Sequence, residues 1–330
     1  MEESEPDIQA LVLGGPEWYT RDEMASASRL DMTDVARLWR AMGFPDVGDS
    51  RAFTDADLSA LLRVAALVER GPLDMAAVVE VARSLGQTTA RLADWQIDSI
   101  GRRLHPEAGV KLSNLSGDVI AREVSELLPE LEQLLVYVWR RQIAATLGRG
   151  MADPVPDPTQ QSASAATVGF ADLVSFTRLS RQLDDKELGS LVEAFESVSA
   201  DVVHANSGRL VKTLGDEIMF VAPTADAAAQ ISVDLHAAHS QDDQVPEIRI
   251  GLATGVVLNR MGDVYGTTVN RASRYTAMAK PGTTLVDTVT SEVLQADPED
   301  NRFVVRALTP RPVRGFGIVR PYAVTQKDPV

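Results

Sequence analysis

A short hairpin pattern in the second half of this 330-residue chain restricts its fold more than any other feature. The stretch Arg209–Phe220 contains two apolar runs, and Gly215-Asp216 lies between them. Two such runs joined by a turn that needs glycine predict a β-hairpin. A carboxylate beside buried strands is costly unless hydrogen bonds or a cation compensate its charge. Asp216 is therefore either a turn residue that bonds its own backbone or a functional carboxylate.

Strand and helix patterns alternate on both sides of this hairpin. A short strand over 168–171 precedes a long helix over 175–206, and an alanine-rich helix over 224–239 follows the hairpin. A strand, a turn and a second strand over 248–258 come next, and then a helix over 268–279. Three further strands are expected at 284–287, 303–306 and 322–325. The order strand, helix, two strands, helix, strand predicts a ferredoxin-like (βαββαβ) α+β domain with appended strands.

The first half of the chain carries helical patterns only. Capping-box patterns at Thr20–Glu23 and Thr54–Asp57 predict two helix starts, and an apolar stripe over 117–147 predicts a long helix. That long helix suits a core role or pairing with a second copy of itself. A proline-rich segment, Asp153–Pro158, forbids helix and separates the two patterns.

These patterns divide the chain into three parts. We expect an all-helical domain over residues 1–150, a linker over 151–166 and an α+β domain over 167–330.

The composition excludes several classes of function. A net charge of −15 argues against general binding to nucleic acid or anionic membranes. The chain has no cysteine and only four histidines, so any bound divalent metal would be a hard ion held by carboxylates. It has no signal-peptide pattern at its start and no apolar run of the roughly 18 residues that a membrane helix needs. We therefore expect a cytoplasmic protein that neither binds nucleic acid nor enters a membrane.

Two acidic residues mark the first candidate site. Asp172 ends the first strand and Asp216 lies in the hairpin turn, on strands that can be neighbours in a βαββαβ sheet. Carboxylates at one sheet edge repel each other unless cations lie between them. Two divalent ions could there hold the attacking and leaving oxygens of a displacement at phosphorus. The backbone amides near Ser175, Phe176 and Thr177 begin a helix and could bind phosphate.

Two further pairs of polar residues complete the candidates. Lys212 and Asp263 offer a donor and an acceptor, which fits N1 and N6 of adenine and mismatches guanine. Asn270 and Arg274 lie four residues apart and share a helix face. One can orient a sugar oxygen while the other meets charge developing on a phosphate. Taken singly, all four are also compatible with ordinary polar surface positions.

Four motifs of the second half, within residues 167–323, together resemble the catalytic domain of class III nucleotidyl cyclases. They are Phe-Ala-Asp172-Leu-Val-Ser-Phe-Thr, Val-Lys212-Thr-Leu-Gly-Asp216, Ile-Arg249-Ile-Gly and Gly-Asp263-Val-Tyr-Gly-Thr-Thr-Val-Asn270-Arg-Ala-Ser-Arg274. The resemblance implies an adenylate cyclase that forms 3′,5′-cyclic AMP and pyrophosphate from ATP. It implies that Asp172 and Asp216 bind two Mg²⁺ or Mn²⁺ ions.

The resemblance also assigns the remaining candidates. Lys212 and Asp263 would select adenine, and Asn270 and Arg274 would stabilise the transition state. Arg249 and, by a looser match, Arg314 would contact phosphate. In this family one chain supplies the metal ligands and its partner supplies the base-binding and transition-state residues. Because all six occur here, the resemblance implies a homodimer with two shared active sites.

The first half resembles the autoinhibitory regulatory domain of soluble actinobacterial cyclases. Family members of that type respond to acidity, and a fatty acid is associated with that type of domain. Residues 146–168 contain no histidine, the side chain that titrates near neutral pH, so acid sensing is not expected at this joint.

Two other hypotheses concern the whole chain. It could be a catalytically silent nucleotide-binding module, or a helix-turn-helix regulator of DNA. The first half carries 16 basic against 24 acidic residues, a net charge of −8 that disfavours the DNA regulator.

Overall fold

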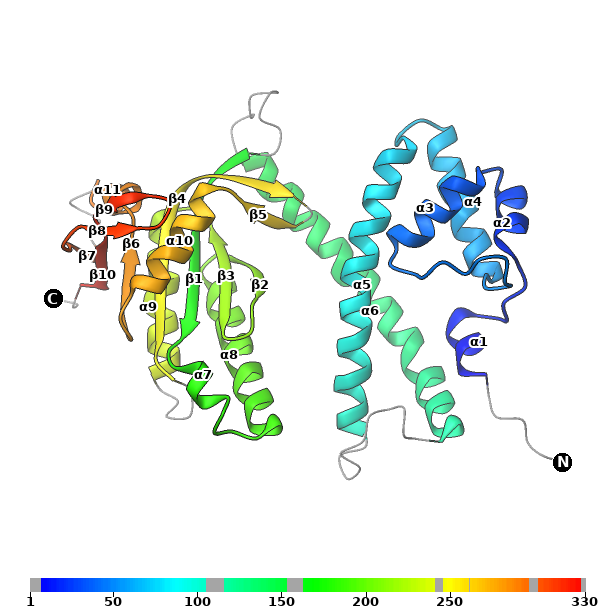
Figure 1. Cartoon of the computed structure of the whole chain (residues 1–330), viewed down its shortest axis with the longest axis horizontal. Coiled ribbons are helices and arrows are strands. Elements are labelled where there is room, and N and C mark those ends of the chain that lie inside the picture. Colours follow the sequence, from blue (N-terminus) through cyan, green and yellow to red (C-terminus); the bar gives the residue numbers. More distant parts are fainter. Residues whose placement is uncertain are drawn as a thin grey trace. The chain divides into compact units, whose positions relative to one another are not determined.

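A computed structural model of the chain describes residues 7–104, 116–152, 163–240, 246–260, 262–296 and 302–327. Its contacts divide the chain into two compact units, Met1–Asp153 and Pro154–Val330. Figure 1 shows that the first unit is built from helices and that the second contains the sheet. No helix within the described ranges is long and apolar enough to cross a membrane.

The helices of the first unit begin where its sequence provides caps. They are α1 (Ile8–Leu13), α2 (Arg21–Ser28), α3 (Met32–Ala41), α4 (Asp55–Glu69), α5 (Met75–Leu104) and α6 (Gly117–Ala152). The capping boxes predicted for α2 and α4 are both present, at Thr20 with Glu23 and at Thr54 with Asp57. Helix α1 was not predicted, because six residues are too few to show an apolar periodicity.

The first unit buries a hydrophobic core of its own. Phe53, Met24 and Leu38 are almost completely buried there, and residues of α5 such as Val78 pack against them. Helices α2 to α5 also line an open apolar pocket of about 320 Å³. These contacts make α2 to α5 one packed body.

The second unit is an α+β fold organised around one large sheet. Its elements are β1 (Ala163–Leu173), α7 (Phe176–Leu179), α8 (Asp185–Ala205), β2 (Arg209–Thr213), β3 (Glu217–Ala222), α9 (Ala225–Ser240), β4 (Ile248–Arg260), β5 (Asp263–Tyr265), α10 (Thr267–Met278), β6 (Thr284–Val286), α11 (Thr288–Leu294), β7 (Phe303–Ala307), β8 (Arg311–Val313), β9 (Gly317–Val319) and β10 (Tyr322–Gln326). The strand order is β2-β3-β1-β4-β6-β10-β7, and β5 pairs with β4. The neighbours β2-β3-β1-β4 are antiparallel, which confirms the predicted ferredoxin-like order.

The sheet is covered by helices on both faces. Phe170 points to the face on which α10 lies, whereas Ala171 and Leu173 contribute to the core beneath α8 and α9. This alternation follows from the two-residue period of a strand. Figure 1 shows α10 on one side of β1 and β4, with α9 on the other. The first strand is therefore buried on both faces.

The structure corrects the predicted start of the first strand. Strand β1 begins at Ala163 rather than Val168, and all of it pairs with β4. The stretch 163–166, which the sequence assigned to the linker, is therefore strand, and residues 153–162 lie outside the described ranges. Small residues such as Ala165 and Ser164 hid this extension, because they carry no apolar alternation.

Two other predictions about elements were wrong. The helix expected over 175–206 is interrupted, because Asp184 caps α8 afresh through a capping box with Glu187. The strand, turn and strand expected over 248–258 form one continuous strand, β4. Its glycines do not make a turn. Gly251 and Gly255 instead give α10 room to approach the sheet.

Candidate active site

Asp172 is the penultimate residue of β1, which lies between two neighbouring strands. It is opposite Glu217 of β3 on one side and Arg249 of β4 on the other. Its side chain is only 12% exposed. The guanidinium of Arg249 donates to Asp172 Oδ2 through Nε at 2.6 Å, and Nη2 lies 2.5 Å from the same oxygen. This charged pair fixes the orientation of the carboxylate.

The hairpin turn brings Asp216 to the same edge of the sheet. Gly215 adopts a φ of 75°, the left-handed conformation that the sequence predicted this turn to need. The amide of Leu173 donates to the carbonyl oxygen of Asp216 at 2.9 Å. The backbones of the two predicted metal ligands are thus tied together at the point where β1 ends.

The local electrostatics show that these carboxylates interact. Burial raises the pKa of Asp172 above its usual value. Arg249 opposes this rise through its hydrogen bond and charge, while the charge of Asp216 adds to it. A cation placed between the carboxylates would remove that repulsion.

Glu217 is a third carboxylate at this edge, and the sequence reasoning missed it. Burial, followed by the charges of Asp172 and Asp216, raises the pKa of Glu217 to about 7. It directly follows Asp216 and faces Asp172 across the β1–β3 pair. Residues directly opposite on antiparallel strands carry their side chains on one face. The pairing register of β1 with β3, which the sequence does not show, is the signal that identifies Glu217.

The residues at this edge fit a hard divalent metal. Within the described parts of the chain, no three His, Cys, Asp or Glu residues group into a metal cage. Mg²⁺ is usually held by one or two carboxylates together with water and substrate phosphates, rather than by such a cage. Asp172 and Asp216 supply this donor set.

Lys212 and Asp263 form a second cluster. Lys212 Nζ lies 2.6 Å from Asp263 Oδ2, although the residues are 51 positions apart in the chain. Burial acts to raise the pKa of Asp263, but hydrogen bonds from Lys212 and the Val264 amide outweigh it and lower that pKa. The register of β2 shifts between Leu210 and Lys212, which is a β-bulge. Bulges re-aim side chains, and no pattern in the sequence predicted this one.

Asn270 and Arg274 lie together on α10, as their spacing predicted. Both are exposed, and neither side chain makes a hydrogen bond or ion pair with the described residues. The helix itself is held to the sheet, because the Thr268 hydroxyl donates to Val256 O at 2.8 Å and the Thr276 hydroxyl to Phe170 O at 3.3 Å. The structure therefore presents two polar side chains from a fixed helix without joining them to either cluster.

The remaining candidates have different environments. Phe176 and Thr177 are in α7, which is only four residues long, and Phe176 packs against the hydrophobic core. Thr177 is exposed. Arg314 is exposed in the turn between β8 and β9. Arg249, predicted to contact phosphate, is instead bonded to Asp172 in this structure.

Comparisons with known proteins find similarity to nucleotidyl cyclases. Residues 159–326 match the family described as the adenylate and guanylate cyclase catalytic domain. An adenylate cyclase of Streptomyces coelicolor is 45% identical over 97% of this chain and 89% of its own length. A pH-sensitive adenylate cyclase of Mycobacterium tuberculosis is 29% identical over 92% of this chain and 77% of its own. A solved catalytic core of a rhodopsin-guanylyl cyclase with converted specificity, in complex with ATPαS, is 25% identical over 50% of this chain and 98% of its own, with a TM-score of 0.46.

Proposed function

The chain belongs to the adenylate and guanylate cyclase family, and we propose that it converts ATP into 3′,5′-cyclic AMP and pyrophosphate. The observation that carries this proposal is the meeting of Asp172 and Asp216 at one sheet edge, where the amide of Leu173, next to Asp172, donates to the carbonyl oxygen of Asp216 at 2.9 Å. A strong similarity to an adenylate cyclase across both units of the chain supports the same activity.

The two carboxylates suit the triphosphate end of the substrate. Asp172 and Asp216 would hold two Mg²⁺ or Mn²⁺ ions, which when bound neutralise phosphate charge and lower the pKa of the ribose 3′-hydroxyl. Arg249 keeps Asp172 in place through contacts of 2.5 and 2.6 Å. In the reaction, the 3′-oxygen bonds to the α-phosphorus and its proton passes to solvent. The bond from the α-phosphorus to the bridging oxygen breaks, and pyrophosphate leaves.

The Lys212–Asp263 pair suits the base of ATP. Adenine offers an acceptor at N1 and a donor at N6, so the ammonium of Lys212 can donate to the first and Asp263 can accept from the second. The pair is already in contact at 2.6 Å, which places the donor and the acceptor side by side before the base arrives. Guanine has the opposite pattern at these positions and would leave both side chains mismatched.

Asn270 and Arg274 suit a site shared between two chains. Both are exposed on α10 and have no side-chain partner among the described residues. In a homodimer, α10 of one protomer would face the carboxylates of the other, so that Asn270 orients the ribose and Arg274 meets the developing charge. Two such sites follow from the twofold symmetry.

Loss of either carboxylate tests this proposal. Asp172→Ala and Asp216→Ala should abolish cyclic AMP formation from ATP with Mn²⁺, while size-exclusion chromatography still shows the wild-type dimer. Asp201→Ala removes an exposed carboxylate from α8 and should leave turnover unchanged. Turnover at the wild-type rate in either site variant would refute the metal assignment. Nucleotide binding without turnover by the wild-type chain would favour the silent-module hypothesis.

The helical unit is proposed to regulate this activity. It folds around its own core, and its apolar pocket of about 320 Å³ could accept a fatty acid or another apolar ligand. Three expectations remain predictions: a cytoplasmic location, a helical domain over residues 1–150 and a catalytic domain over residues 167–330.

A further inference from the structure

Arg271 lies between the two proposed transition-state residues on α10, but its side chain has a different environment. Asn270 and Arg274 are exposed, whereas Arg271 is only 31% exposed and forms an ion pair with Asp287. Arg271 Nη1 lies 2.7 Å from Asp287 Oδ2. The helix is therefore held by a charged contact one residue away from Asn270.

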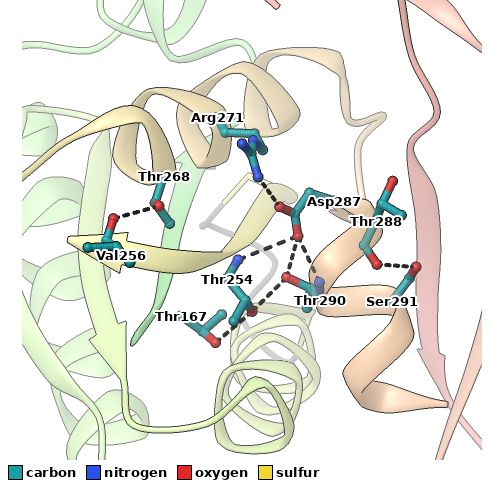
Figure 2. A network of polar contacts seen from close by, with 9 residues as sticks. All are labelled: Thr167, Thr254, Val256, Thr268, Arg271, Asp287, Thr288, Thr290 and Ser291. Carbon is teal, nitrogen blue, oxygen red and sulfur yellow. Dashed lines mark hydrogen bonds and ion pairs between the residues drawn. The ribbon is translucent and has the colours of Figure 1, made fainter. Parts of the chain in front are cut away.

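Asp287 is itself fixed by several elements. It is 2% exposed and caps α11, where its Oδ1 accepts hydrogen bonds from the Thr290 amide at 2.9 Å and the Thr290 hydroxyl at 2.6 Å. The Thr290 hydroxyl lies 2.8 Å from that of Thr254 in β4, which lies 2.9 Å from that of Thr167 in β1. Figure 2 shows this chain of contacts leading from the sheet to Arg271. The carboxylate is a rigid anchor.

A second contact holds the guanidinium from the β8–β9 turn. Arg271 lies over the ring of Phe316, 5.8 Å from its centroid. A guanidinium over an aromatic face is attracted by the ring quadrupole. Phe316 is two residues from Arg314 in this turn. Arg271 thus connects α10 to two separate parts of the domain.

The other contacts of α10 set its distance from the sheet. Gly251 and Gly255 of β4 let the helix approach closely, and Thr268 and Thr276 bond backbone carbonyls of β4 and β1. The contacts of Arg271 lie elsewhere on the helix and oppose its rotation. A rotation would move Asn270 and Arg274 together, and a misplacement of about 1 Å at a reacting centre can cost about 100-fold in rate.

We propose that Arg271 is a positioning residue, which Asp287 and Phe316 hold so that α10 presents Asn270 and Arg274 to the shared site. This inference rests on the proposed function. Arg271 contacts no substrate in this scheme and acts only through the helix.

Asp287→Asn is the sharpest variant for the test. The amide oxygen can still accept from Thr290, but the NH₂ group that replaces Oδ2 cannot accept from Arg271. We expect kcat to fall about 10- to 100-fold because α10 is misplaced, while KM for ATP changes by less than about two-fold. Arg271→Gln breaks the same contact from the other side and should behave alike. A wild-type kcat in both variants would overturn the proposal.

The control variant is Asp184→Asn. Asp184 caps α8 much as Asp287 caps α11, accepting from the amides of Lys186 and Glu187. It should keep the wild-type kcat, since the same chemical change is made away from α10. An equal fall in kcat in this control would show that the effect of Asp287→Asn comes from a weakened helix cap, which would also overturn the proposal.

Mixed dimers separate a positioning role from general damage to the fold. Chains with two different tags are co-expressed, and the mixed dimer is purified over both. Asp287→Asn paired with Asp172→Ala leaves one site with intact carboxylates from the first chain and an intact α10 from the second. This dimer should regain about half of the wild-type turnover, because one of its two equivalent sites is complete. Asp287→Asn paired with Asn270→Ala has a defective α10 in both sites and should regain none of the lost turnover.

The pairing of Asn270→Ala with Asp172→Ala tests the shared site alone. If this pair regains turnover and the pair of Asp287→Asn with Asp172→Ala does not, the positioning role is wrong and the proposed function stands. If the Asn270→Ala pair also stays inactive, the shared site of the proposed function is wrong, and the role of Arg271 is refuted with it.

Discussion

At the scale of single residues, the contact between Lys212 and Asp263 leads to a prediction about specificity. The pair offers a donor and an acceptor 2.6 Å apart, which fits adenine. Lys212→Glu combined with Asp263→Cys reverses the donor and removes the acceptor charge, so the preference for ATP over GTP should erode. The measurement is kcat/KM for each nucleotide. A hydrogen-bonding mismatch at the base should change the ratio of kcat/KM for ATP to that for GTP by about 10-fold or more. An unchanged ratio would show that these residues do not recognise the base.

A second prediction at this scale concerns His236, which is half-buried on α9. Its Nε2 lies 3.1 Å from the Thr284 hydroxyl. Burial, followed by the charge of His239, lowers the pKa of His236 from 6.5 to about 4. Between these values the unfolded chain binds a proton that the folded chain does not. The stabilising effect of neutral His236 is therefore complete above pH 6.5 and is lost as the pH falls toward 4.

His236→Gln should remove most of this pH dependence. Glutamine can still bond Thr284 but does not titrate, so the variant should lose about 2 kcal/mol less stability than wild type between about pH 7.5 and 5. Denaturant unfolding of the full chain at the two pH values measures the difference. His204→Gln, at an exposed position near the end of α8, is the control. Equal losses in wild type and His236→Gln would contradict the prediction.

At the scale of elements, the sequence predicted what depends on neighbouring residues. The capping boxes at Thr20 and Thr54 and the glycine of the hairpin turn were recognisable because each acts within a few residues. Contacts between distant residues were not recognisable. Asp172 and Arg249 are 77 positions apart, and no sequence pattern near either residue indicates that they pair. The same reason explains why a turn was expected within residues 248–258, since the helix that needs Gly251 to lack a side chain comes later in the chain.

Gly251 gives the prediction at this scale. A Cβ at this position would lie 2.1 Å from the backbone nitrogen of Thr276 and 2.5 Å from the carbonyl oxygen of Ala272. Because backbone atoms cannot rotate away, Gly251→Ala must push α10 from the sheet. We expect it to destabilise the protein by about 1–3 kcal/mol, as overpacking commonly does, and to lower kcat by moving Asn270 and Arg274.

Gly189 provides a matched control for this substitution. It lies within α8 with nothing inside 4 Å of an added Cβ. Gly189→Ala should therefore stabilise the protein by up to about 1 kcal/mol through helix propensity and leave kcat unchanged. Denaturant unfolding and cyclic AMP assays of both variants make the comparison. If Gly251→Ala matched Gly189→Ala in both measurements, the claim that α10 packs closely against β4 would be wrong.

At the scale of the whole molecule, the hydrophobic cores of the two units are separate. The core of the helical unit contains Phe53 and Leu38, while the cores of the second unit are formed around Phe220 and Phe170. Each cluster draws its buried residues from one unit only. A domain with a complete core of its own can fold without its neighbour. We therefore expect residues 160–330, which include all of β1, to fold alone.

The isolated second unit then tests autoinhibition by the helical unit. If the helices restrain catalysis, the fragment 160–330 should form cyclic AMP faster than the full chain at equal protomer concentration, and the ratio should vary with pH or added fatty acid if either is the signal. Near-ultraviolet circular dichroism confirms that the fragment is folded, and assays over a range of concentrations correct for any weaker dimer. The fragment with Asp172→Ala is the control for background turnover. Equal rates for fragment and full chain under all these conditions would show that the helical unit does not inhibit the enzyme.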